Sequence, residues 1–142
     1  MIKSCTSDVI IDCMYEDSIK SRFNGTEANP GPDGSYSCIL INDINFAASV
    51  DGVTGAHLED LDETNVTTFI KDENVVMTVL PKGMEVFFPN LEGIFVEGFD
   101  FLLLSANDLI PFNNTLKYLS IVRTSLSYLE AGLFTEMLNL EI

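Results

Sequence analysis

The stretch Val66–Asn139 reads VTTFIKDENVVMTVLPKGMEVFFPN (66–90), LEGIFVEGFDFLLLSANDLIPFNNT (91–115) and LKYLSIVRTSLSYLEAGLFTEMLN (116–139). Shifting each piece by 25 residues onto the next brings apolar residues together in six columns. A fixed period of about 20–50 residues is the signature of repeat architectures. The columns are Val66/Leu91/Leu116, Phe69/Ile94/Leu119, Val76/Phe101/Leu126, Val79/Leu104/Leu129, Met84/Leu109/Phe134 and Phe87/Phe112/Met137.

Each unit contains the pattern Leu-x-x-Leu-x-Leu, which predicts a short strand. The pattern is filled by Leu91, Ile94 and Val96 in the second unit and by Leu116, Leu119 and Ile121 in the third. Side chains alternate across a strand, so we expect Ile94 and Val96 to point into the coil while Phe95 and Glu97 face solvent. Because no coil can bury its own apolar face, stability depends on stacking against neighbouring coils.

This pattern resembles the extracellular leucine-rich-repeat family over more than half of the chain. The N-terminal half is similar to secreted insect members, in which a Cys…Tyr-x-Cys strand pair and a Gly-x-His segment precede the first repeat. The matching residues are Cys13, Tyr36, Cys38, Gly55, His57, Thr64, Asn65, Val66, Phe69, Leu80, Pro81, Gly83, Phe87, Phe88, Pro89, Asn90 and Leu91, with Met84 in place of the commoner leucine.

The resemblance implies an α/β-type solenoid that is mostly β: a right-handed coil with a parallel sheet, preceded by an antiparallel β cap. We expect the cap at residues 1–63 and about three repeats at 64–142, with Leu140 and Ile142 beginning a truncated fourth. The N-terminus has no apolar signal-peptide core. We therefore expect a secreted protein whose signal was removed, or a fragment of a longer repeat array.

Two strands and a disulfide are expected in the cap. Val9 and Ile11 lie on one side, and Ile10 and Asp12 on the other, of an expected strand that continues to Tyr15. Ser35–Ile41 forms a second strand. Antiparallel pairing of the two would bring Cys13 and Cys38 together, and closing a loop of this length contributes about 3 kcal/mol. Cys5 is then free or has a partner outside this chain. The competing interpretation is a zinc site, which needs four closely spaced ligands.

Two features depart from the family pattern. Lys71 falls on an inward strand position, where an unpaired ammonium would be costly. Either its ammonium reaches the open edge, or the first unit slips by one residue. The family also has Asn where the strand turns; Asn74 fits, but Phe99 and Thr124 stand in the next two units. Those turns need other partners for their backbone groups.

The charge limits the partners. Seven Lys and Arg residues stand against 22 Asp and Glu, a formal net charge of −15. This balance disfavours nucleic acid and anionic membranes, and no apolar run is long enough to insert into a bilayer. It favours solubility or a basic partner.

Residues with possible chemistry have alternative explanations. His57, the only histidine, is either a base oriented by Glu59, Asp60, Asp62 or Glu63, or a cap residue bonded to backbone. The same acidic residues with Asp51 lack the spacing of a calcium loop. We therefore expect no enzyme activity, metal or cofactor. Sequons that would accept glycans in a secreted protein begin at Asn24, Asn65 and Asn113.

The concave face of the repeats is the expected binding site. Its outward positions are Thr68, Ile70, Asp72, Gly93, Phe95, Glu97, Tyr118, Ser120 and Val122. Phe95 beside Tyr118 would form an aromatic patch of the kind that marks contact surfaces. The leading hypothesis is a non-enzymatic extracellular module that recognises a protein or peptide. The alternative is an assembly role in which the open last coil stacks on another chain.

Overall fold

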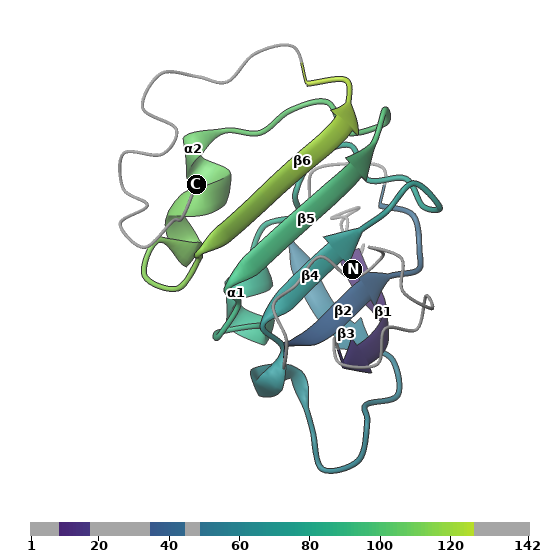
Figure 1. The fold of residues 1–142 in the computed structure, drawn as a ribbon, viewed down its shortest axis with the longest axis vertical. Helices are drawn as coiled ribbons and strands as arrows, with labels where there is room; N and C mark the ends of the chain where they lie inside the picture. Colours follow the sequence, from purple (N-terminus) through teal and green to yellow (C-terminus); the bar gives the residue numbers. More distant parts are fainter. Residues whose placement is uncertain (1–8, 18–34, 45–48, 127–142) are drawn as a thin grey trace, which may run out of the picture.

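A mixed six-stranded sheet dominates the computed structural model, which describes residues 9–17, 35–44 and 49–126. The strands are β1 (Val9–Asp17), β2 (Tyr36–Leu40), β3 (Val50–Thr54), β4 (Thr68–Lys71), β5 (Gly93–Gly98) and β6 (Tyr118–Thr124). Short helices lie between them: η1 (Glu63–Asn65), α1 (Met84–Phe87), α2 (Ala106–Leu109) and η2 (Ile110–Phe112). The order across the sheet is β3-β1-β2-β4-β5-β6 (Figure 1).

The last three strands stack in phase with the sequence repeat. β4, β5 and β6 run parallel, and Phe69 pairs with Ile94, which pairs with Leu119. The prediction of adjacent, same-direction strands at Leu91–Val96 and Leu116–Ile121 is therefore confirmed. The return paths also meet, in a parallel bridge between Val79 and Leu103. The columns at Leu129, Phe134 and Met137, with the expected fourth unit, lie outside the described residues.

The N-terminal strands join the same sheet. β1 and β2 pair antiparallel, as expected, and Cys13 and Cys38 form the predicted disulfide with their Cα atoms 5.1 Å apart. The alternation of Val9 and Ile11 is confirmed, since both are buried while Ile10 is exposed. The cap is not purely antiparallel, however. β3 pairs parallel to β1, and β2 pairs parallel to β4, so hydrogen bonding continues from the cap into the repeats.

Both explanations offered for Lys71 are wrong. It pairs with Val96 in the unslipped register, and its side chain has no exposed surface. Its ammonium donates instead to Asp100 Oδ1 and to the Glu97 carbonyl, each at 2.8 Å. Partial burial alone would raise the pKa of Asp100, but the hydrogen bonds from Lys71 and the Met77 amide outweigh it and lower this pKa. The buried cation is thus neutralised by the next coil.

Two polar side chains lie next to Phe99 and Thr124, the positions at which the resemblance predicted Asn. Asp100, one residue after Phe99, accepts the Met77 amide at 2.7 Å. Ser125, one residue after Thr124, donates its hydroxyl to the Phe99 carbonyl. Each of these side chains lies one position after the expected Asn, and each bonds to backbone of the preceding sequence unit. Asp100 thus satisfies the Met77 amide, and Ser125 satisfies the Phe99 carbonyl.

Candidate functional site

The nine residues of the predicted concave face differ in their exposure to solvent. Its members on β4, Thr68 and Ile70, are 1% and 6% exposed, and Gly93 at the start of β5 is also buried. The remaining members are half-buried except for Val122, which is 44% exposed; they are Asp72, Phe95, Glu97, Tyr118 and Ser120. The part open to a partner therefore lies mainly on β5 and β6. We call Phe95, Glu97, Tyr118, Ser120 and Val122 the β5–β6 face.

The Phe95 ring turns over Gly93, whose missing side chain makes room for it: an added Cβ would lie 2.9 Å from Phe95 Cε1. Gly93 pairs with Tyr118 on the neighbouring strand. Among the residues described, no direct ring contact joins Phe95 to Tyr118. The aromatic patch therefore stays a prediction.

A β-bulge places a cation beside this face. Glu97 pairs with Val122 and Gly98 with Thr124, so Arg123 is the extra residue on β6. Its φ of 49° lies in the left-handed region, which is uncommon for a residue with a side chain. Bulges re-aim side chains, and here the Arg123 guanidinium forms an ion pair with the Glu97 carboxylate. Their side chains are 63% and 24% exposed respectively.

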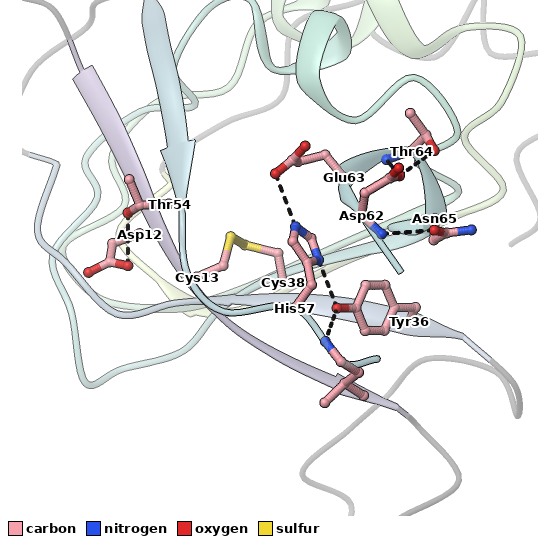
Figure 2. Close-up of polar contacts among 11 residues, drawn as sticks. Asp12, Cys13, Tyr36, Cys38, Thr54, His57, Asp62, Glu63, Thr64 and Asn65 are labelled. Carbon is pink, nitrogen blue, oxygen red and sulfur yellow. Dashed lines mark hydrogen bonds and ion pairs between the residues drawn. A yellow bond between two sulfur atoms is a disulfide. The ribbon is translucent and has the colours of Figure 1, made fainter. Parts of the chain in front are cut away.

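A second polar cluster surrounds His57, at the junction between the cap and the repeats (Figure 2). Tyr36 comes from β2, and Glu63 comes from η1, where Asp62 provides the N-terminal cap. His57 Nδ1 lies 2.9 Å from the Tyr36 hydroxyl and Nε2 lies 3.0 Å from Glu63 Oε2. The imidazole also stacks on Tyr15 from β1, with ring centroids 3.8 Å apart. Residues from β1, β2 and η1 thus meet at the His57 ring.

The hydrogen bonds define a direction for this network. The Leu58 amide donates to the Tyr36 oxygen at 3.1 Å. The Tyr36 hydroxyl can then donate to His57 Nδ1, which leaves Nε2–H to donate to Glu63. Among the four carboxylates considered for orienting His57, Glu63 is the one that bonds its ring. Within the described residues, the contacts of the two ring nitrogens are to side chains and not to backbone.

The environment of the two tyrosines opposes their ionisation. Burial, followed by the nearby Glu63 carboxylate, raises the pKa of Tyr15. Burial also raises the pKa of Tyr36, against the opposing effect of the Leu58 amide. Tyr36 is 6% exposed, and its oxygen already has two partners. The arrangement resembles a catalytic relay in connectivity, but it buries the hydroxyl that such a relay would have to expose.

A shallow depression of about 350 Å³ adjoins the cluster, lined by Tyr15, Glu16, Asp17 and Leu58. Within the described parts of the chain, no three His, Cys, Asp or Glu side chains gather closely enough to hold a metal ion. Of the acidic residues in this segment, Asp62 has a local structural role. Asp62 caps η1, and the Thr64 hydroxyl and amide lower its pKa.

The sequons differ in setting. Asn65 is exposed, and its side-chain oxygen accepts the Asp62 amide at 2.9 Å. Asn113 follows η2 and is half-buried. Asn24 and Cys5 lie outside the described residues.

Sequence reasoning missed the two tyrosines of the His57 cluster and the role of Arg123. The Tyr-x-Cys pattern that contains Tyr36 was visible, but only as part of a resemblance. The bulge at Arg123 has no signal in apolar periodicity, since it depends on how β6 pairs with β5.

Comparison of the chain with family models, curated proteins and solved structures finds no match. In the residues that the structure describes, no helix is long and apolar enough to cross a bilayer.

Proposed function

We propose that this chain forms an extracellular leucine-rich-repeat solenoid that recognises a protein or peptide without catalysing a reaction. The observation that carries this proposal is the parallel register of β4, β5 and β6. Phe69, Ile94 and Leu119 lie side by side at the sequence period, which is how stacked repeats bury a shared core. Solenoids of this kind use the strand face as an extended binding surface.

An extracellular location is supported by the Cys13–Cys38 disulfide, because such bonds persist mainly in oxidising compartments. Recognition is supported by the composition of the β5–β6 face. Phe95 and Tyr118 are both partly accessible, and the partly accessible Glu97 follows Phe95 by two residues on β5. Aromatic residues are enriched among those that dominate binding energy.

The test is capture of a secreted protein from extracellular fluid, followed by direct titration of the purified partner. The double variant Phe95→Ala/Tyr118→Ala should weaken binding at least about tenfold, because residues that anchor an interface contribute about 1–2 kcal/mol or more each. The matched control is Phe99→Ala, which removes an exposed ring outside the face, 68% exposed. Equal binding by the double variant and the control, with both folded by circular dichroism, would refute this surface.

The second candidate is assembly through coil stacking. Leu119 and Ile121 occupy the inward positions of β6 but remain partly exposed, whereas their equivalents Ile94 and Val96 are buried. A coil from another chain could cover them. Light scattering over a concentration series tests this role, and a molar mass of one chain at every concentration argues against it.

A further inference from the structure

We propose that the β5–β6 face binds a basic, extended segment of a partner protein, and that Arg123 is a resident cation which this segment displaces from Glu97. The inference rests on the proposed function and specifies the partner's chemistry. The first observation is the bulge, where Arg123 has a left-handed backbone conformation that is uncommon for a residue with a side chain.

The bulge decides where the Arg123 side chain goes. Strict alternation from Val122, which faces outward, would direct residue 123 into the coil beside Ile121. Because Arg123 is the extra residue of the bulge, its charged side chain is not directed into the core and instead pairs with the Glu97 carboxylate. The carboxylate is thus occupied by a cation from the same chain.

The Arg123 side of the pair is open to solvent. Arg123 is 63% exposed, although Glu97 is only 24% exposed, and ion pairs near the surface contribute little to stability. A partner's Lys or Arg could take the place of Arg123 at Glu97 while its flexible stem packs on the exposed part of Phe95. Asp72, which directly follows the neighbouring strand β4, adds a second half-buried carboxylate near the C-terminal ends of these parallel strands.

Charge complementarity identifies the partner as basic. The chain carries a formal net charge of −15, so its field attracts cationic segments and repels acidic ones. An extended backbone suits a face built from parallel strands, because alternate side chains of the segment would point at the sheet.

The experiment measures binding of a fluorescein-labelled octapeptide of alternating lysine and serine to the full chain at low ionic strength. Arg123→Gln should tighten binding about two- to fivefold, the amount expected when an exposed ion pair no longer has to be broken. Glu97→Gln should weaken binding by a similar factor. Two matched variants change the net charge equally elsewhere: Lys117→Gln, whose ammonium lies 3.9 Å from Glu92, and Glu73→Gln, which is exposed.

The outcomes separate this inference from the function on which it rests. Equal effects of Arg123→Gln and Lys117→Gln would overturn it, as would an unmeasurable affinity of the wild-type chain for the peptide. Tighter binding of an acidic glutamate–serine peptide, lost in Arg123→Gln, would make Arg123 an anchor and also overturn it. If spermine shows the same Arg123-dependent gain as the peptide, the commitment to a peptide segment is wrong. If a captured partner needs Phe95 and Tyr118 but ignores Arg123, the recognition function stands and this inference falls.

Discussion

Lys71 Nζ lies 2.8 Å from Asp100 Oδ1, so a fully buried ammonium at the end of β4 is neutralised by a carboxylate that follows β5. Asp100 also accepts the Met77 amide through its other oxygen. One carboxylate therefore serves two purposes: it pairs a buried charge, and it satisfies a backbone amide.

Asp100→Asn should destabilise the fold by about 2–4 kcal/mol, because it leaves the Lys71 charge buried without a counter-ion. The value is below that of a fully buried pair because the Asp100 side chain is 24% exposed. Lys71→Met, which removes the buried charge and keeps the volume, should cost less than Asp100→Asn, because the carboxylate that it leaves is 24% exposed and still accepts the Met77 amide. Urea unfolding measures both, and a larger loss in Lys71→Met than in Asp100→Asn would contradict the assignment.

The same pair should make the protein sensitive to acid. The pKa of Asp100 is lowered in the folded state from its ordinary value of 3.8. The unfolded chain therefore binds a proton at a higher pH than the folded chain, and the stabilisation is present above about pH 4 and lost as the pH falls through the folded pKa. Urea titrations from about pH 5 to about pH 3 should find that the difference in stability between wild type and Asp100→Asn shrinks. A constant difference would contradict the lowered pKa.

Gly98→Ala should cost about 2–4 kcal/mol. Its φ is +137°, and an added Cβ would lie 2.4 Å from Lys71 Nζ and 2.5 Å from Asp100 Oδ1. The control is Gly52→Ala, whose φ is not positive and whose Cβ would meet Ile10 Cδ1 at an ordinary 3.4 Å. Thermal unfolding should separate the two variants clearly. Similar melting temperatures would mean that the ion pair does not pass so close to this glycine.

Tyr36→Phe should destabilise the fold by about 1–2 kcal/mol, because it leaves the Leu58 amide and His57 Nδ1 without their partner. Tyr118→Phe, which alters a half-buried tyrosine of the β5–β6 face, is the control. Imidazole ¹⁵N shifts at neutral pH report the tautomer directly. We expect the proton on Nε2, facing Glu63, and a proton on Nδ1 instead would reverse the hydrogen-bond direction assigned here.

Apolar periodicity was sufficient to predict the parallel pairing of β4, β5 and β6, because each sequence unit places the same apolar positions against the next. Val66, Leu91 and Leu116 have no exposed surface, and each unit reproduces the same burial need. The Cys13–Cys38 bond was also predictable, since alternation located the two strands. The candidate face was less so. Nothing in the pattern indicated that Thr68 and Ile70 would be buried.

By itself, the sequence determined the step between β4, β5 and β6 and the alternating burial within β5, because a repeated apolar column is buried most effectively against its own equivalent. The tertiary structure alone decided the partners of Lys71, His57 and Arg123. Asp100 lies 29 residues from Lys71 and Tyr36 lies 21 residues from His57. Polar partners so far apart in the chain meet only after the strands have paired. A single hydrogen bond or ion pair produces no periodic pattern in the sequence from which it could be predicted.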